Sequence, residues 1–234
     1  MCTLTYLPLE NDSFILTSTR DVMRLRAEAS KPKEYKLNGL RLYYAKDGKA
    51  GGTWLGMSGY KRLICLMNGA FDFYFPDPPY KKSRGLVLLD VLSIKDNLIK
   101  LNDFEGIEPF TMIIIEWSSG LELFELRWDG INKHFKKLEN KAQLWSSSSL
   151  YNETVKNKRQ DLFNSWLKNN SEYNEHEIMQ FHHLETDDPK NGIRMKRDLF
   201  CSVSLSCIKK VNNNISWTYK DLISDKEYVE SLKL

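Results

Sequence analysis

The chain has 234 residues, of which 41% are hydrophobic and 12% aromatic, and this is enough apolar material for one large packed domain. Its 34 basic and 31 acidic residues are interspersed, which argues against a basic face that binds nucleic acid. No apolar run approaches the roughly 18 residues that a membrane-spanning helix needs, and the first residues lack the regions of a signal peptide. We therefore expect a cytoplasmic protein with no integral membrane segment.

The first part of the chain is dominated by short extended segments. An apolar, β-branched run at 1–7 predicts a strand, and a second strand is expected to end at Thr19-Arg20-Asp21. Residues 21–29 are compatible with a short helix. The elements expected next are strands at 40–45 and 62–68, a glycine turn with a strand at 49–56, an aromatic and proline-rich loop at 71–80, and a helix at 86–94.

The second part contains a hairpin, two helices and two further strands. Continuous apolar runs at 110–117 and 121–128, joined by Ser118-Ser119-Gly120, predict a hairpin with strands buried on both faces. Helical spacing of apolar residues predicts amphipathic helices at 153–169 and 175–184. Strands are expected at 199–208 and 215–219. This order indicates one α+β domain over residues 1–234, with two sheets and helices packed outside them.

Cys2 is the residue with the most informative position. Four cysteines, at positions 2, 65, 201 and 207, have neither metal-site spacing nor the density of a disulfide framework. Cys65, Cys201 and Cys207 fall in apolar runs and are interpreted as core residues. Cys2 follows Met1 directly, so removal of Met1 would create an N-terminal thiol beside a free α-amine, which together supply a nucleophile and a base.

An ordered set of short motifs links the chain to a known family. They comprise Cys2-Thr3, Thr17-Ser18-Thr19-Arg20-Asp21, Gly51-Gly52-Thr53-Trp54-Leu55, Cys65-Leu66-Met67-Asn68-Gly69-Ala70, Ser83-Arg84-Gly85-Leu86, Gly106-Ile107-Glu108-Pro109-Phe110, Glu125-Leu126-Arg127-Trp128-Asp129-Gly130 and Trp145-Ser146-Ser147. Together these motifs resemble the NRDE family, also called transport and Golgi organisation protein 2.

That family is similar to cysteine N-terminal-nucleophile hydrolases, and the resemblance implies their four-layer αββα sandwich. It also implies a catalytic set in which Cys2 is the nucleophile, Arg20 and Asp21 stabilise its thiolate and amine, and Asn68 contributes to an oxyanion hole. Because neighbours on a strand point to opposite faces, only one of Arg20 and Asp21 can face Cys2 unless the strand bends.

Each of these residues also has a purely structural interpretation. Cys2 could be an ordinary small residue of a strand, and Arg20 and Asp21 could form an ion pair or cap a helix. Asn68-Gly69 is a strong turn signal by itself. Gly51-Gly52 lacks the ending of a phosphate-binding loop, and its glycines are expected to allow a close backbone approach or a tight bend.

Aromatic residues and histidines raise the question of a bound ligand or metal. Trp54, Phe71 and Phe73 are the candidate ligand-binding residues, and the loop at 71–80 is either a core flap or an exposed apolar rim that suits a lipid-like or planar ligand. His182 and His183 are neighbours on a predicted helix and point about 100° apart. We therefore expect no paired metal site there and assign no metal or cofactor.

The leading hypothesis is an amidohydrolase that cleaves a small acyl amide or ester, acting on C–N bonds other than peptide bonds. The alternative is a non-enzymatic intracellular carrier or chaperone of a hydrophobic ligand such as haem or a lipid-like molecule, because the resemblance extends to proteins linked to haem trafficking. A third possibility is an interaction protein that kept the fold and lost the chemistry. In the first two cases the partner is a small molecule.

Overall fold

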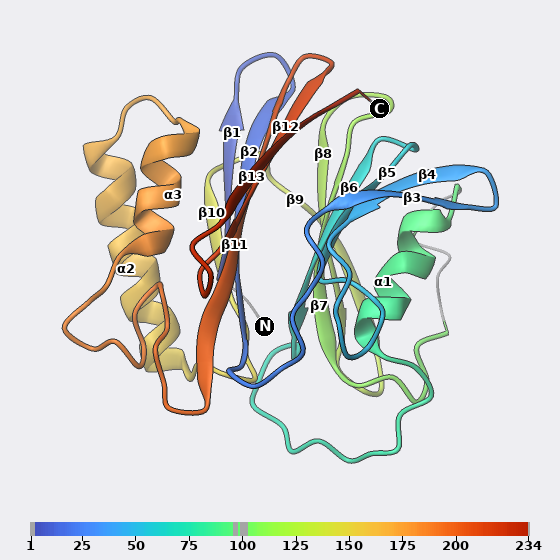
Figure 1. Cartoon of the computed structure of the whole chain (residues 1–234), viewed down its shortest axis with the longest axis horizontal. Helices are drawn as coiled ribbons and strands as arrows, with labels where there is room; N and C mark the ends of the chain where they lie inside the picture. Colours follow the sequence, from blue (N-terminus) through green and yellow to red (C-terminus); the bar gives the residue numbers. More distant parts are fainter. Residues whose placement is uncertain (1–2, 96–97, 99–102, 234) are drawn as a thin grey trace. The chain divides into compact units, whose positions relative to one another are not determined.

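The computed structural model describes residues 3–95, 98 and 103–233, which form two compact units. Residues 3–25 and 141–233 make up the first unit, and residues 26–140 contain the second. Each unit combines one antiparallel sheet with a helical layer, so the chain is α+β (Figure 1).

A six-stranded sheet forms the centre of the first unit, in the order β10-β1-β2-β11-β12-β13. The helices α2 and α3 cover one of its faces (Figure 1). Its strands are β1 (Thr3–Leu9), β2 (Ser13–Met23), β10 (Gln143–Ser146), β11 (Phe200–Val211), β12 (Asn214–Asp221) and β13 (Glu227–Leu232). Between sheet and helices lies an apolar core of Leu7, Ile15, Phe163, Ile178, Phe181, Ile193 and Cys207.

Both helices of this unit begin at asparagine caps. The helix α2 (Glu153–Asn169) has the predicted bounds, and Asn152 accepts a hydrogen bond from the backbone N–H of Val155 at 3.0 Å. The helix α3 (Glu175–His183) is capped in the same way by Asn174. Such caps satisfy backbone donors that would otherwise lack a partner in the first turn.

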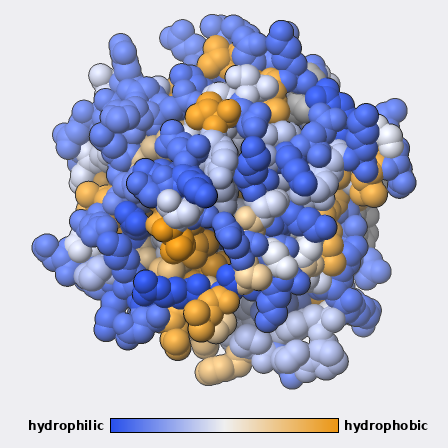
Figure 2. Space-filling view, viewed as in Figure 1, coloured by the Kyte–Doolittle hydropathy of each residue, from blue (hydrophilic) through white to orange (hydrophobic). Residues whose placement is uncertain are grey.

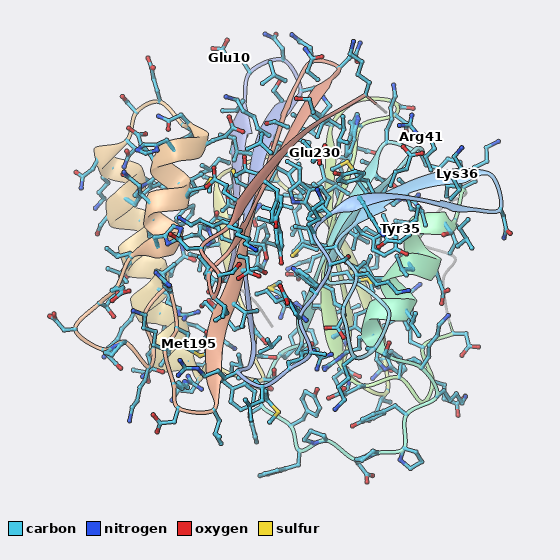
Figure 3. The ribbon with its side chains drawn as sticks, viewed as in Figure 1. Glu10, Tyr35, Lys36, Arg41, Met195 and Glu230 are labelled. Carbon is cyan, nitrogen blue, oxygen red and sulfur yellow. The ribbon has the colours of Figure 1, made fainter. Side chains whose placement is uncertain are left out.

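A seven-stranded sheet forms the second unit, with its strands in sequence order from β3 to β9. Strands β3 (Lys33–Leu37) and β4 (Leu40–Tyr44) form a hairpin, in which Arg41 pairs with Glu34; Arg41 is labelled in Figure 3. The remaining strands are β5 (Leu55–Ser58), β6 (Arg62–Asn68), β7 (Phe110–Glu116), β8 (Glu122–Trp128) and β9 (Lys133–Leu138). The helix α1 (Arg84–Ser93) packs on one face through Val87, Leu88, Val91 and Leu92.

The glycine motifs of this unit meet at the start of α1. A Cβ atom on Gly52 would lie 2.4 Å from the carbonyl carbon of Gly85, and one on Gly85 would lie 2.8 Å from the carbonyl oxygen of Thr53. The backbone N–H of Thr53 also donates to the carbonyl of Gly85 at 3.2 Å. The expected close backbone approach therefore occurs, and it joins two sequence motifs that are about 30 residues apart in the printed sequence.

The hairpin at 110–128, the helices at 86–94, 153–169 and 175–184 and the strand at 62–68 agree with the sequence predictions. The strand β7 is buried on both faces as expected, whereas β8 alternates between buried and partly exposed residues. The short helix predicted at 21–29 is wrong, because β2 continues to Met23 and a turn and irregular backbone follow it. The strands β3, β9, β10 and β13 were not predicted.

In the viewed surface, hydrophobic side chains form small separate patches within a mainly hydrophilic exterior (Figure 2). Across the described ranges, no helix combines the length and the apolar character that crossing a membrane requires.

Candidate functional site

The predicted nucleophile, Cys2, lies outside the described residues, of which Thr3 is the first. Thr3 is fully buried as the first residue of β1. Its backbone N–H donates to the hydroxyl of Thr19 at 3.1 Å. The beginning of β1 is therefore tied to β2 by a side-chain contact in addition to the strand pairing.

Asp21 is directed toward the face of the first sheet that carries α2 and α3. Its carboxylate accepts hydrogen bonds from the hydroxyl of Ser202 at 2.6 Å and from the phenol of Tyr151 at 2.9 Å. Arg20, the preceding residue of β2, consequently points to the opposite face of the sheet, as alternation along a strand requires. Both residues are buried, so the two predicted charged groups act on different sides of β2.

A register irregularity accompanies this arrangement. Asp21 pairs with Ser202 and Arg20 pairs with Ser204, so β11 contains one extra residue between these pairs. Such bulges redirect side chains and increase the local twist of a strand. Here the bulge lies in β11 opposite the Arg20–Asp21 step, and the Ser202 hydroxyl that binds Asp21 also accepts a hydrogen bond from the backbone N–H of Met195 at 2.9 Å (Met195 is labelled in Figure 3).

Tyr151 and Arg159 extend the hydrogen bonds of Asp21 on the helix-covered side of the first sheet. The guanidinium of Arg159 lies 3.5 Å from the centre of the Tyr151 ring and donates to the hydroxyl of Thr3 at 2.7 Å. Burial and the neighbouring Asp21 raise the pKa of Tyr151 well above its ordinary value, although Arg159 opposes this shift. The phenol therefore remains protonated and acts as the donor to Asp21.

Asn68 belongs to the second unit, where it is the last residue of β6 and pairs with Phe110 of β7. Gly69 follows with a φ of 80°, a conformation that favours glycine, and its N–H donates to the carbonyl of Pro109 at 3.0 Å. The Asn68-Gly69 dipeptide is thus not a two-residue hairpin turn, because the backbone pairing with the segment that leads into β7 continues past the end of β6.

Side chains of β7 and β8 bind the backbone that follows Asn68. The hydroxyl of Thr111 donates to the carbonyl of Gly69 at 2.8 Å, and Arg127 donates to the carbonyl of Ala70 at 2.8 Å. Arg127 also pairs with the buried Glu125 at 2.8 Å. Burial raises the pKa of Glu125, but hydrogen bonds and charges from Arg127 and Lys136 outweigh it, and the pKa is lowered overall.

The predicted ligand-binding aromatics occupy different environments. Trp54 is buried immediately before β5. Phe71 and Phe73 are 43% and 63% exposed, and Phe75 is 84% exposed, with the rings of Phe73 and Phe75 packed edge to face at 5.1 Å. The loop is anchored between them by Tyr74, whose hydroxyl donates to Glu108 at 2.7 Å. Of the two interpretations of this loop, the core flap does not fit these exposures.

His182 is a buried histidine of the first unit, and its Nε2 lies 2.8 Å from the hydroxyl of Thr5. Burial, with smaller contributions from His183 and Arg159, lowers the pKa of His182 to about 3. The imidazole is therefore neutral at physiological pH. Within the described part of the chain, no three His, Cys, Asp or Glu side chains are grouped so that they could hold a metal ion.

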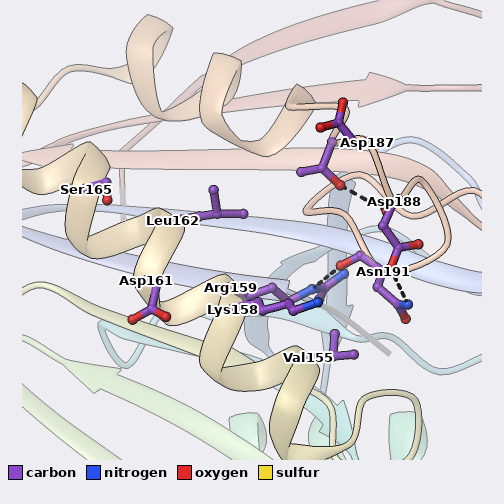
Figure 4. Close-up of a pocket in the computed structure, with 10 residues that line it drawn as sticks. Val155, Lys158, Arg159, Asp161, Leu162, Ser165, Asp187, Asp188 and Asn191 are labelled. Carbon is purple, nitrogen blue, oxygen red and sulfur yellow. Dashed lines mark hydrogen bonds between the residues drawn. The ribbon is translucent and has the colours of Figure 1, made fainter.

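A cavity of about 380 Å³ lies in the first unit beside α2 (Figure 4). Arg159 and Asn191 both line it, and Arg159 donates to the carbonyl of Asn191 at 3.1 Å. The lining consists of Val155, Lys158, Arg159, Asp161, Leu162 and Ser165 of α2 together with Thr186, Asp187, Asp188 and Asn191. No sequence motif indicated this cavity.

Tyr151, Arg159 and Ser202 were not identified from the sequence. One signal was present for Arg159, which stands in the apolar i, i+4 series of Val155, Phe163 and Leu167. A cation at a position where a helix normally presents an apolar residue to the core indicates a specific buried partner. Tyr151 and Ser202 carried no comparable signal.

Comparison with known proteins gives a consistent result. The model of the Transport and Golgi organisation 2 family matches residues 1–215. No curated protein sequence gives a significant match. Similar solved structures include a variant of conjugated bile acid hydrolase from Clostridium perfringens, with a TM-score of 0.59 and 9% identity over 100% of this chain and 97% of that chain.

Two further structures share the fold. An N-acylethanolamine-hydrolyzing acid amidase ortholog from Caenorhabditis elegans has a TM-score of 0.60 and 12% identity over 88% of this chain and 92% of that chain. Penicillin V acylase from Agrobacterium tumefaciens has a TM-score of 0.54 and 9% identity over 100% of this chain and 86% of that chain. The predicted fold class, that of the N-terminal-nucleophile hydrolases, is confirmed. Because the family model covers nearly the whole sequence, the chain belongs to the Transport and Golgi organisation 2 family.

Proposed function

We propose that this protein is a cysteine N-terminal-nucleophile amidohydrolase that cleaves a small acyl amide or ester. The observation that carries the proposal is the presence of Cys2 immediately before the first strand of a fold shared with a bile acid hydrolase, an acid amidase and an acylase. A fold alone does not imply a function. The proposal therefore depends on the chemistry that residue 2 can perform.

The chemistry requires only groups that the N-terminus supplies. After removal of Met1, the α-amine has an ordinary pKa of about 7.7 to 8.0 and the thiol one of about 8.5, so proton transfer from thiol to amine costs little. The thiolate then attacks the acyl carbonyl and forms a C–S bond. Collapse of the tetrahedral intermediate breaks the C–N or C–O bond, and the amine or alcohol departs with the proton. Water hydrolyses the thioester and regenerates the thiol.

The neighbouring predicted residues receive distinct roles in this proposal. Arg20 is assigned to stabilise the thiolate, because a nearby guanidinium lowers the pKa of a thiol. Asp21 is assigned to hold β2 in place, since both carboxylate oxygens are already bonded to Tyr151 and Ser202. For Asn68, which belongs to the second unit, the oxyanion role stays a prediction from the sequence.

A panel of chromogenic N-acyl amides and acyl esters tests the proposal when wild type is compared with cysteine variants. Cys2→Ala is expected to abolish turnover. Cys201→Ser is the matched control, because burial raises the pKa of the Cys201 thiol and makes it a poor nucleophile. Turnover that survives Cys2→Ala, or that is lost only in Cys201→Ser, would contradict the assignment.

A second candidate function, transport of a hydrophobic ligand such as haem, is favoured by one observation. Phe73 and Phe75 are exposed side by side on a loop that Tyr74, the residue between them, anchors to Glu108. Clusters of exposed aromatic rings are unusual on proteins that bind nothing apolar. A carrier with this surface needs no nucleophile, so Cys2 would have no role in binding.

A haem titration followed by absorbance separates the two candidates. If the protein is a carrier, binding persists in Cys2→Ala and weakens about tenfold in the double variant Phe73→Ser, Phe75→Ser, through loss of roughly 1.4 kcal/mol of apolar contact. Leu25→Ser, which removes an exposed aliphatic side chain from the first unit, is the control. Equal binding in all variants would count against this surface as the ligand site.

A further inference from the structure

Arg159 is a buried cation that the apolar spacing of α2 does not explain. It is 1% exposed and stands one turn before Phe163, on the side of the helix that faces the core. Taking a guanidinium out of water costs several kcal/mol unless hydrogen bonds compensate for it. The contacts that it makes must therefore explain why a cation is retained at this position.

The contacts of Arg159 join three separate segments of the first unit. Its three nitrogens donate to the hydroxyl of Thr3 and to the carbonyls of Asn191 and Gly192, and its plane lies over the ring of Tyr151. Among the described residues it forms no ion pair with a carboxylate. Figure 4 shows the guanidinium directed toward Asn191, to whose carbonyl it donates.

Tyr151 connects Arg159 to the second strand. The face of its ring lies against the guanidinium at 3.5 Å, while its hydroxyl donates to Asp21 at 2.9 Å. The aromatic ring is thus placed between a cation and an anion, both of which are buried. Arg159 therefore supports β1 directly, through Thr3, and β2 indirectly, through Tyr151.

We propose that Arg159 is a positioning residue that fixes the beginning of β1, and with it Cys2, for the reaction. This inference rests on the proposed function. Thr3 follows Cys2 directly, and consecutive Cα atoms are only about 3.8 Å apart, so an anchored Thr3 restricts where the thiol and the α-amine can lie. Small misplacements of reacting groups cost large factors in rate.

The chemical nature of arginine matters for this role. A guanidinium donates in several fixed directions within one plane and stacks on an aromatic ring, whereas an ammonium group is a compact charge that cannot do both. Arg159→Lys therefore keeps the charge and loses the geometry. Thr3→Val removes only the acceptor at the other end of the contact and leaves the cation in place.

The test compares Arg159→Lys, Thr3→Val and the double variant with wild type, after intact mass has established the N-terminus of each protein. We expect each single variant to lower kcat about tenfold with little change in KM, since each removes a contact that positions the reacting group rather than one that binds the substrate. The double variant should be no slower than the single variants, because both remove the same contact.

The control is Arg62→Lys, which alters a buried arginine of the second unit that binds Glu116 and two carbonyls but does not contact Thr3. It is expected to lower stability comparably and to leave kcat near the wild-type value. Equal losses of kcat in Arg62→Lys and Arg159→Lys, or additive losses in the double variant, would overturn the positioning role.

Amide hydrogen exchange at Thr3 separates this inference from the proposed function. The Thr3 amide is bonded to Thr19 at 3.1 Å. It should exchange about tenfold faster in Arg159→Lys than in Arg62→Lys, because only Arg159→Lys removes the hydrogen bond that holds the Thr3 side chain. If wild type retains Met1 or shows no turnover, the proposed function fails while faster exchange still supports the anchoring of β1. Unchanged exchange in Arg159→Lys would overturn the anchoring itself.

Discussion

The phenol of Tyr151 donates a hydrogen bond to the carboxylate of Asp21 at 2.9 Å, although the two residues are 130 positions apart in the sequence. Ser202 occupies the other carboxylate oxygen. Asp21 is therefore committed to the helix-covered face of the first sheet, and the adjacent Arg20 is left to the opposite face. Asp21 therefore holds β2 in place on the helix-covered face, while the charge of Arg20 lies on the opposite face of the sheet.

Tyr151→Phe is expected to destabilise the protein by about 1 to 3 kcal/mol, because it leaves one oxygen of a buried carboxylate without its donor. The free energy of unfolding from urea titration measures this loss. Tyr80→Phe is the control, since the Tyr80 hydroxyl takes part in an exposed hydrogen bond with the backbone of Asp77. A Tyr151→Phe protein as stable as wild type would contradict the structural role of this contact.

Gly52→Ala should destabilise the second unit by about 1 to 3 kcal/mol or more, because the new Cβ would lie 2.4 Å from backbone atoms that cannot move independently. Gly59→Ala provides a matched comparison. A Cβ there would meet its nearest neighbour at 3.6 Å, and the substitution is expected to be neutral or slightly stabilising. Thermal unfolding of both variants measures the difference, and similar midpoints would refute the close contact with Gly85.

The stability of the protein is expected to fall as the pH drops below about 6.5. The pKa of His182 is about 3 in the folded protein against an ordinary value of 6.5, so the unfolded chain binds a proton that the folded protein excludes. This difference removes about 2 kcal/mol of stability between pH 7 and pH 5. In His182→Gln, the free energy of unfolding measured by urea titration should no longer show this loss between pH 7 and pH 5. Identical pH profiles for wild type and His182→Gln would rule out the contribution of His182.

Arg127→Met should loosen the aromatic loop and cost about 1 to 3 kcal/mol, because it frees the carbonyl of Ala70 and leaves Glu125 buried with Lys136 as its remaining cation. Hydrogen exchange over residues 70–80 measures the loosening. Arg41→Met removes an exposed pair with Glu34 and is expected to change stability by less than about 0.5 kcal/mol. Unaltered exchange in Arg127→Met would show that other contacts hold the loop.

The sequence predicted the interior of each sheet but not its edges. The strands at 110–116 and 62–68 were recognisable because they are apolar runs buried on both faces, whereas the second strand of the hairpin, β8, alternates between buried and partly exposed residues. The four strands that were missed, β3, β9, β10 and β13, are the outermost strands of the two sheets. Edge strands carry polar and exposed residues along much of their length, so they lack the apolar pattern on which such predictions depend.

The candidate site was predictable only where a short motif marks it. Cys2 and Arg20-Asp21 stand in local patterns, whereas Tyr151, Arg159 and Ser202 reach Thr3 and Asp21 from distant parts of the chain. Tertiary contacts of this kind leave little trace in a single sequence. The predicted helix at 21–29 failed for a related reason, because pairing with β11 extends β2 to Met23.

Intact-mass spectrometry of the purified wild-type protein, before and after treatment with a thiol-directed acylating reagent, tests the central claim most directly. We expect the protein to lack Met1 and to gain one acyl group at Cys2, which is lost in Cys2→Ser and kept in Cys201→Ser. Retention of Met1, or acylation at a cysteine other than Cys2, would contradict it.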